Sequence, residues 1–200
     1  MTTTMFAVPM GTALISQSTC DKIKPLKGVT QHECTDDDFD VLKDYPEIKQ
    51  ELTDTFVEWV NELLRVKANW VMTTSWITEN STGREMTRHS HKNCAYSGVL
   101  YFDEVDDSHA PLIFENPLEP FTTVFPQNLQ TNCNEYNTDQ FVVTPEETRM
   151  IFFPSYLFHK HHAYTPTSIP RRSLACNFFP IGKYGHHDST LDTNWLRHGI

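Results

Sequence analysis

The chain has 200 residues, a length that suits a single all-β domain. Its formal net charge is −10 at pH 7, which argues against a nucleic-acid partner, because neutralising phosphates requires a basic face. Much of the acidic charge lies before residue 62, where it is typical of a solvated surface.

The cysteine pattern and the N-terminus indicate a compartment. No Cys-x-x-Cys spacing occurs, so neither a zinc knuckle nor a disulfide framework is predicted, and the thiols suit a reducing cytoplasm. The apolar stretch Met5–Ile15 contains Pro9 and Gly11 and follows no basic residue, which argues against a signal peptide. No segment resembles a membrane span. We therefore expect a cytoplasmic protein without a membrane partner. The five cysteines are Cys20, Cys34, Cys94, Cys133 and Cys176.

The first third of the chain is predicted to be extended at first and helical later. Residues 1–30 look like extended segments separated by proline and glycine. Thr35 is a candidate N-cap for a short helix through Lys43. A longer helix is predicted from Pro46 to Val66, because apolar residues recur there at three- and four-residue steps. This stripe is typical of core packing, and we assign it no chemical role. Its members are Ile48, Leu52, Phe56, Val60, Leu63 and Leu64.

From Asn69 onward, short β-rich runs alternate with turn residues. Eight strands after N-terminal helices predict a mainly β fold, a double-stranded β-helix (jelly roll) with the helices packed on one sheet. We expect one domain over residues 1–200, with a core at 69–180 between an N-terminal part (1–68) and a tail (181–200). The predicted strands are Trp70–Thr78, Ala95–Phe102, Pro111–Phe114, Thr122–Phe125, Gln140–Val143, Arg149–Phe153, Phe158–Tyr164 and Arg171–Phe179.

A His-x-His pair and a distant third histidine predict a metal site. Side chains alternate along a strand, so His89 and His91 point to the same face, about 7 Å apart along the chain. His159 closes a later apolar run. Three imidazoles on one face of an ion leave the opposite positions open, as oxygen-activating non-haem iron requires. We predict that these three residues bind one metal ion.

The pattern leaves alternatives open. A three-ligand face without thiolate favours iron, but spacing alone admits zinc, copper, manganese or nickel. His161 shares the strand parity of His159 and replaces it as ligand if the register differs. Isolated histidines are expected by chance in a chain with ten of them. We therefore give no role to His32, His109, His186 and His187.

The run after Pro170 has two chemically different faces. One face carries Arg171, Ser173, Ala175 and Asn177, and the other Arg172, Leu174, Cys176 and Phe178. Burying a guanidinium, a hydroxyl and an amide inside a barrel is costly unless something binds there. A carboxylate fits the guanidinium fork bidentately. Arg171 is thus predicted to anchor a carboxylate ligand. Arg172 is the fallback, and a surface ion pair is the alternative without function.

Further motifs surround these candidates in a consistent order over roughly residues 70 to 180. His89-Ser90-His91 is followed, after a short gap, by Ser97-Gly98-x-x-Tyr101. The other segments are Ser75-Trp76, Leu-Ile-Phe-Glu-Asn-Pro at 112–117, Phe-Pro-Ser-Tyr-Leu-Phe-His at 153–159 and Arg-Arg-Ser-Leu-Ala-Cys-Asn at 171–177. Together they resemble a family of 2-oxoglutarate/Fe(II)-dependent oxygenases that is frequent in marine bacteria and in phages of photosynthetic bacteria.

The resemblance implies an oxidoreductase with Fe(II) and 2-oxoglutarate as cofactor and cosubstrate. The cosubstrate would be decarboxylated to succinate while a substrate C–H bond is oxidised, usually by hydroxylation. His89 and His159 would be the two invariant metal ligands. Arg171, helped by Ser173, would hold the distal carboxylate of 2-oxoglutarate, and Tyr101 would either hydrogen-bond the cosubstrate or pack. A phage-encoded enzyme would work in the host cytoplasm.

One position departs from the wider pattern. Most 2-oxoglutarate oxygenases carry Asp or Glu where this chain has His91, so either three histidines bind the iron or His91 is displaced. Three-histidine cupin-type dioxygenases without 2-oxoglutarate are the alternative function. Gly83 and Pro154 fit their signature, but the glutamate expected after His91 is missing, and Tyr156 replaces a glycine. A non-catalytic jelly-roll binding protein is a third alternative.

The segment Pro126–Thr138 is rich in Asn, Thr and Gln and has no apolar periodicity. It predicts a long loop, either a lid over the site or a solvated connection. The pattern does not indicate the substrate, which can be a small molecule or a protein, or the oligomeric state. Aromatic residues either line a pocket or pack in the core. They are Trp76, Phe114, Phe121 and Phe125.

Overall fold

The computed structural model describes residues 7–28, 39–118, 132, 134 and 137–197. The helices are α1 (Gln17–Ile23) and α2 (Pro46–Leu64), with 3-10 turns η3 (His187–Ser189) and η4 (Asn194–Arg197). The strands are β1 (Gly11–Leu14), β2 (Asn69–Asn80), β3 (Met86–His89), β4 (Tyr96–Leu100), β5 (Leu112–Glu115), β6 (Gln140–Val143), β7 (Arg149–Pro154), β8 (His159–His161), β9 (Arg171–Ile181), β10 (Lys183–Tyr184) and β11 (Leu191–Asp192).

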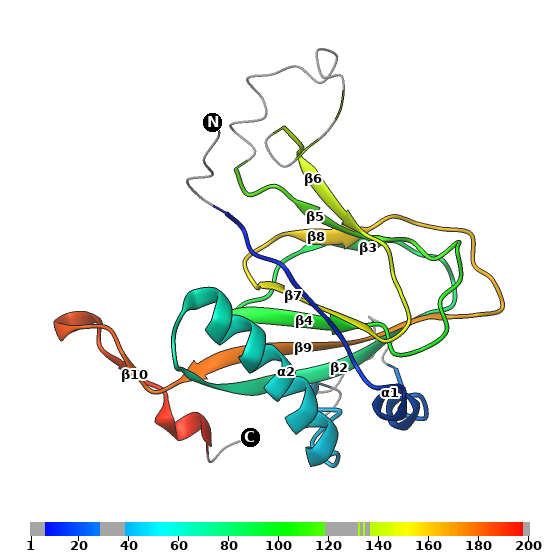
Figure 1. Ribbon diagram of the computed structural model, residues 1–200. Helices are drawn as coiled ribbons and strands as arrows, with labels where there is room; N and C mark the ends of the chain where they lie inside the picture. The colour runs from blue at the N-terminus through cyan, green and yellow to red at the C-terminus, as the bar shows by residue number, and fades with distance from the viewer. Residues whose placement is uncertain (1–6, 29–38, 119–131, 133, 135–136, 198–200) are drawn as a thin grey trace.

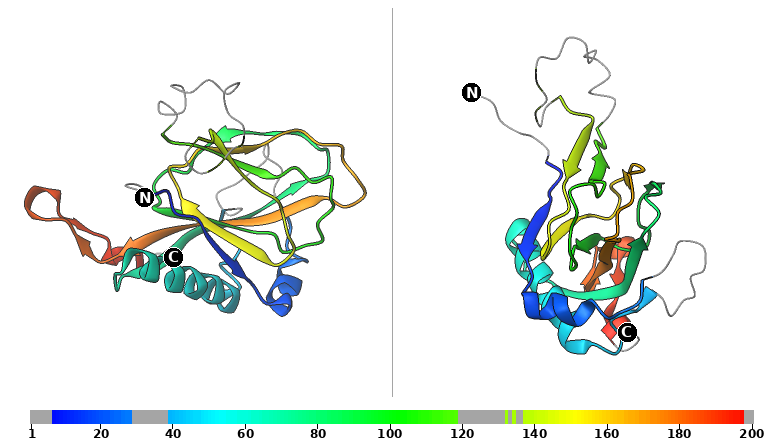
Figure 2. Two further views of the ribbon diagram at one scale, coloured as in Figure 1. Left: turned by 45° about the horizontal axis from the view of Figure 1, so that its top comes forward. Right: turned by 90° about the vertical axis from the view of Figure 1, so that its right-hand side faces the viewer.

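Two antiparallel sheets organise these strands. The larger has the order β1-β7-β4-β9-β2 and the smaller β3-β8-β5-β6. α2 lies across one face of the larger sheet, and the smaller sheet lies on the opposite face of the larger sheet (Figures 1 and 2). The β10–β11 hairpin projects from one end of the molecule (Figure 2). The fold is therefore mainly β, with the described helices on one side.

Seven of the eight predicted strands are confirmed, with shifted ends; the eighth, Thr122–Phe125, lies outside the described residues. The run Phe158–Tyr164 forms a strand only over His159–His161. The short strands β3, β10 and β11 were not predicted, and β1 was expected only as extended chain within residues 1–30. β1 has four residues and pairs with β7, which lies far along the chain. Its own sequence therefore gives little indication of a strand.

The long helix is confirmed as α2, with one correction at its end. Pro46 occupies the first turn, and Arg65 terminates the helix in the left-handed conformation with φ of 53°. Leu63 and Leu64, predicted to belong to the apolar stripe, are 40% and 45% exposed. Hydrophobic periodicity alone therefore overestimates burial in the last turn of α2.

The segments before α2 differ from the prediction. α1 is a helix where extended chain was predicted, and the Ser16 hydroxyl caps it by accepting a hydrogen bond from the Thr19 N–H at 3.2 Å. The proposed cap Thr35 and the first residues of the predicted short helix lie outside the described residues, but residues 41–44 form a turn, so the predicted extension of that helix through Lys43 is wrong. The Val41 N–H instead donates to the Ser75 carbonyl at 2.9 Å, which draws the chain along the edge of β2.

Two apolar layers flank the larger sheet. The layer under the helices contains Phe56 of α2, whose ring stacks on Phe178 of β9 with centroids 4.0 Å apart. The layer between the sheets contains Phe114, Ile151 and Phe153. β7 contributes alternate residues to both layers and is buried on both faces. The larger sheet is thus the middle layer, and the inner face of β9 looks toward the smaller sheet.

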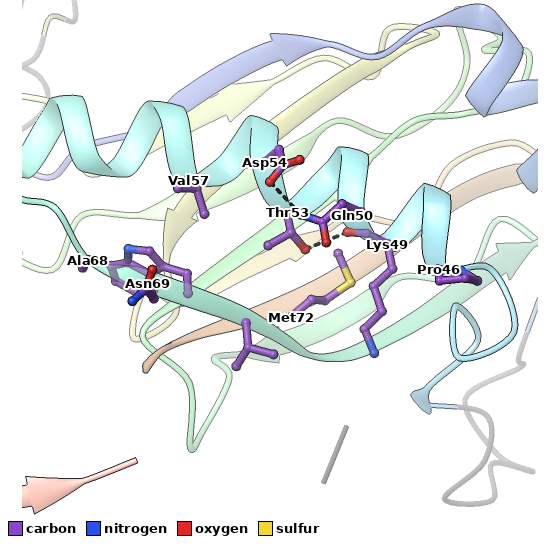
Figure 3. A pocket seen from close by; sticks show the side chains of 11 residues that line it. Pro46, Lys49, Gln50, Thr53, Asp54, Val57, Ala68, Asn69 and Met72 are labelled. Atoms are coloured by element: carbon purple, nitrogen blue, oxygen red, sulfur yellow. Dashed lines mark hydrogen bonds between the residues drawn. The ribbon is translucent and has the colours of Figure 1, made fainter. Parts of the chain in front are cut away.

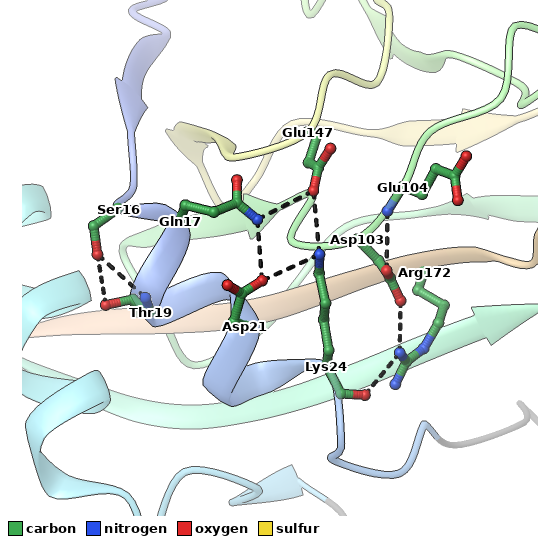
Figure 4. Close-up of polar contacts among 9 residues, drawn as sticks. All are labelled: Ser16, Gln17, Thr19, Asp21, Lys24, Asp103, Glu104, Glu147 and Arg172. Atoms are coloured by element: carbon green, nitrogen blue, oxygen red, sulfur yellow. Dashed lines mark hydrogen bonds and ion pairs between the residues drawn. The ribbon is translucent and has the colours of Figure 1, made fainter.

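Arg172 fixes α1 against this middle layer, on the outer face of β9. Its guanidinium donates to the Lys24 and Leu26 carbonyls at 2.9 and 2.6 Å and to the Asp103 carboxylate at 2.7 Å. Figure 4 shows Arg172 between Asp103 and the end of α1, where Lys24 also pairs with Asp21 and Glu147. Arg172 is therefore committed to structural contacts, and we give it no role in ligand binding.

The compartment predictions meet limited evidence. Cys20, Cys94 and Cys176 are free thiols, while Cys34 and Cys133 lie outside the described residues. Within the described part of the chain, no helix combines the length and apolarity needed to cross a membrane. Most of the predicted loop Pro126–Thr138 also lies outside the described residues.

The packing of Phe56 predicts a large effect on stability. Its side chain is fully buried among five aromatic rings, so Phe56→Ala should lower the free energy of unfolding by about 3–5 kcal/mol. The exposed Leu64 on the same helix is the matched control, and Leu64→Ala should change it by less than about 0.5 kcal/mol. Urea denaturation measures both. Similar losses in the two variants would contradict this account of the core.

Candidate metal centre

The three predicted ligands come together where the ends of β3 and β8 meet. β3 pairs with β8 so that His89 lies opposite His159. His91 follows β3 in the connection to β4, where its N–H donates to the Ser155 carbonyl at 3.0 Å. The ring centroids lie 4.3 Å (His89–His159), 5.4 Å (His89–His91) and 5.1 Å (His91–His159) apart. One ligand atom from each residue lies within 4.8 Å of the others.

Hydrogen bonds assign the ring nitrogens. The Nδ1 atoms of His89 and His159 lie 2.9 and 3.0 Å from the carbonyl oxygens of Thr87 and Leu157, each two residues earlier. The Nδ1 of His91 lies 2.8 Å from the side-chain oxygen of Asn177. A carbonyl oxygen only accepts, so each Nδ1 carries the proton and each Nε2 keeps a lone pair. Such a set of Nε2 atoms fits a divalent transition-metal ion.

Burial favours the uncharged form of His91 and His159. His159 is buried, and this burial, reinforced by His89 nearby, lowers its pKa to about 3. Burial also lowers the pKa of the half-buried His91. A protonated imidazole cannot bind a metal ion, so the lowered pKa values keep His91 and His159 available as ligands at neutral pH.

Arg171 points into the interior from the start of β9. It is 6% exposed, its Nε donates to the Ala110 carbonyl at 3.1 Å, and its Nη2 donates to the Tyr101 hydroxyl at 3.2 Å. Burial raises the pKa of Tyr101, so this hydroxyl remains protonated. Among the described residues no carboxylate pairs with Arg171. The alternative of a surface ion pair is therefore not seen among the described residues, and Tyr101 both packs and orients the guanidinium.

Ser173 follows Arg171 on the same inner face. Its hydroxyl lies 2.9 Å from that of Thr78 on the neighbouring strand β2. Thr78 was missed by sequence reasoning, because only the β2–β9 register pairs it with Ser173. The inner face of β9 carries Arg171, Ser173, Ala175 and Asn177 in sequence, so the predicted alternation is confirmed.

His161 lies close enough to both Arg171 and His89 for them to influence its pKa. Burial lowers its pKa to about 4, with further lowering by Arg171 and a smaller effect of His89. Its side chain is not part of the group of ligand atoms within 4.8 Å found among the described residues. His109 is also buried, and its Nε2 lies 3.0 Å from the Ile169 carbonyl, which fits the structural role expected for it.

Trp76 borders the triad from β2. Its ring lies 5.4 Å from that of His91 and 5.7 Å from that of Phe39, which is 37% exposed. Phe114 packs against His159 at 5.8 Å between ring centroids and belongs to the core between the sheets. Phe121 and Phe125 lie outside the described residues. Trp76 is thus a predicted aromatic residue that contacts the candidate site through His91.

A separate cleft of about 410 Å³ lies between α2 and the start of β2. Its lining includes Lys49 and Asp54 of α2 and Trp70 and Met72 of β2, as Figure 3 shows in part. It contains none of the predicted site residues and faces the helix side of the sheet. We assign it no chemistry.

A family model described as "Putative 2OG-Fe(II) oxygenase" matches residues 74–177. The matched range includes the histidine triad and Arg171. The chain belongs to this family. It is a 2-oxoglutarate- and Fe(II)-dependent oxygenase, and Fe(II) and 2-oxoglutarate are its cofactor and cosubstrate. The family match decides against the cupin-type and non-catalytic alternatives. Gly83, part of the cupin pattern, instead serves packing: it has φ of 68°, and a Cβ there would lie 2.0 Å from the Tyr164 carbonyl oxygen.

Solved structures show the same fold at low sequence identity. HygX from Streptomyces hygroscopicus, with nickel and 2-oxoglutarate bound, has a TM-score of 0.57 and 10% identity, over 86% of this chain and 82% of that one. AviO1 from Streptomyces viridochromogenes has a TM-score of 0.58 and 10% identity, over 93% of both chains. The match to a 2OG-Fe(II) oxygenase from Burkholderia pseudomallei, with a TM-score of 0.48 and 13% identity, covers 67% of this chain and 57% of that chain. No curated protein matches the chain.

The lowered pKa values predict a loss of stability in acid. His159 and His161 stay neutral in the folded protein, while the unfolded chain takes up protons below about pH 6.5. Their contribution is complete above pH 6.5 and falls as the pH decreases toward 4, by up to about 1.4 kcal/mol per pH unit for each residue. Urea unfolding of the metal-free protein should show lower stability at pH 5 than at pH 7.5. His161→Gln should reduce this dependence of stability on pH. Equal stability of the wild-type protein at both pH values would contradict the prediction.

Proposed function

We propose that the chain is a dioxygenase that hydroxylates a substrate C–H bond and converts 2-oxoglutarate to succinate and carbon dioxide. One arrangement carries the proposal: His89, His91 and His159 each offer a ligand atom within 4.8 Å of the others, and Arg171 is buried without a carboxylate partner among the described residues. A cation site together with a buried anion anchor suits a metal ion and a dicarboxylate bound in one site.

We assign the metal to His89, His91 and His159. When bound, Fe(II) supplies the activation of oxygen. The protein contributes three imidazoles whose Nδ1–H groups are held by oxygen acceptors, so their orientation needs no rearrangement on binding. His91 takes the place that a carboxylate occupies in most 2-oxoglutarate oxygenases.

We assign the distal carboxylate of 2-oxoglutarate to Arg171. Two of its guanidinium nitrogens are held by Ala110 and Tyr101, while Nη1 has no hydrogen-bond partner within the described part of the chain. Tyr101 fixes the guanidinium and offers its own hydroxyl proton to the same carboxylate. Ser173, two residues along the inner face of β9, adds a second hydroxyl donor.

The proposal also covers the type of β fold, the extent of the domain and the cell compartment. The two facing antiparallel sheets suit a double-stranded β-helix, a fold in which ligands bind between the sheets. We propose a single domain over residues 1–200, since α2, β1 and β9 share one apolar layer. The free thiols Cys20, Cys94 and Cys176 support a reducing, cytoplasmic compartment.

Removing a proposed ligand should abolish metal binding. His89→Ala and His159→Ala should each lower Fe(II) affinity by more than the roughly 10–100-fold that loss of a group behind a ligand costs. Iron content after anaerobic reconstitution measures this. The exposed His187 provides the control, and His187→Ala should bind like wild type. His91→Asp should retain binding, because aspartate is the usual residue at that position. Stoichiometric iron in both alanine variants would refute the site.

Removing the proposed anion anchor should weaken 2-oxoglutarate binding. Arg171→Ala should raise the dissociation constant of 2-oxoglutarate on the order of a hundredfold, because a charge-assisted bidentate pair is lost. Arg171→Lys should recover part of the affinity, since lysine keeps the charge without the planar fork. Arg84→Ala, at an exposed position, is the control. Calorimetric titration of the anaerobic Fe(II) protein measures all three, and unchanged affinity in Arg171→Ala would exclude this anchor.

A further inference from the structure

The three histidines of the triad are not supported in the same way. His89 and His159 direct their Nδ1–H groups to backbone carbonyls two residues earlier, so no side-chain substitution removes these acceptors. His91 depends on the side chain of Asn177, 86 residues along the chain on β9, at 2.8 Å. The imidazole at the carboxylate position is therefore the one whose orientation a side chain controls.

The amide of Asn177 is itself fixed by neighbouring hydroxyl groups. Its side-chain oxygen accepts a second hydrogen bond from the buried Ser97 at 2.8 Å, and Ser97 lies 2.8 Å from the buried Ser155. Its NH2 group donates to the Thr74 hydroxyl at 2.9 Å. In this orientation the oxygen faces His91 and the NH2 group faces away from it. Each polar group in the set has a partner, which the half-buried location requires.

The direction of this amide decides whether His91 can bind a metal. With the oxygen toward His91, Nδ1 carries the proton and Nε2 keeps its lone pair, free for an ion held together with His89 and His159. A reversed amide would donate to Nδ1 and leave the proton on Nε2, pointing at the place where the ion binds. A carboxylate at this position has no tautomers, so it would need no such control.

We propose that Asn177 is a positioning residue: it holds His91 in the Nδ1–H tautomer and thereby makes an imidazole usable as the third metal ligand. The inference rests on the proposed metal site. Thr74 and Ser97 serve the same purpose, because they fix the direction of the amide.

The test measures the tautomer of each histidine in the metal-free protein at pH 8 by long-range ¹H–¹⁵N spectroscopy, together with anaerobic Fe(II) titration. In wild type, His91 should be the Nδ1–H tautomer. Asn177→Leu keeps the approximate shape but removes the acceptor, so His91 should populate the Nε2–H tautomer and Fe(II) affinity should fall by roughly 10–100-fold. His89 and His159 should remain Nδ1–H, since backbone carbonyls hold them.

Two further variants complete the experiment. Asn177→Asp keeps an acceptor in the same place, so it should preserve the Nδ1–H tautomer and bind Fe(II) at least as tightly as wild type. Thr73→Val is the matched control, because the Thr73 hydroxyl touches only the backbone carbonyl of Asn177, at 3.3 Å. It should leave the tautomer and the affinity unchanged.

The outcomes separate this inference from the proposed function. An Nε2–H tautomer of His91 in wild type, or an unchanged Nδ1–H tautomer in Asn177→Leu, overturns the role of Asn177. If Asn177→Leu does not fold, a changed tautomer in Asn177→Asp overturns it equally. A wild-type protein with the expected tautomer that binds no Fe(II) instead overturns the metal site.

Discussion

The two-faced strand β9 is the constraint on which the rest of the structure depends. Its outer residues Leu174, Cys176 and Phe178 are fully buried under the helices. This apolar face fixes the register of β9, because a shift by one residue would exchange its two faces. The polar residues that alternate with these three along the strand therefore face the space between the sheets. Packing on one side of the strand thus places Arg171 and Asn177 on the other.

The polar side chains on the inner face of β9 are stable in this interior because neighbouring strands supply hydrogen-bond partners. The β2 register places Thr78 beside Ser173 and Thr74 beside Asn177. The Arg171 guanidinium is partly satisfied by the Ala110 carbonyl. Unpaired, such groups would each cost about 1–3 kcal/mol. The guanidinium of Arg171 has no carboxylate partner among the described residues, which supports its proposed role as the anchor of an anionic ligand.

The sequence predicted the parts of this arrangement that depend on local pattern. The alternation after Pro170 separated Arg171 from Arg172 correctly, and the His-x-His spacing identified two of the clustered histidines. It could not reveal β3, which has four residues and pairs with β8 far along the chain. Nor could it reveal that Thr74, Ser97 and Ser155 surround Asn177. Those contacts arise where β2, β4, β7 and β9 come together, and no periodicity within one strand records them.

The histidine at the carboxylate position changes the electrostatics of the proposed site. Replacing a carboxylate by a neutral imidazole raises the charge of the ligand set by one unit, which weakens attraction for the cation and strengthens attraction for anionic ligands nearby. Arg171 acts in the same direction on an anion. Burial opposes protonation of His91, His159 and His161, so the added positive charge comes from the metal and Arg171 rather than from the imidazoles. With this balance, the proposed site favours a dianionic cosubstrate, whose charge compensates for the carboxylate that the ligand set lacks.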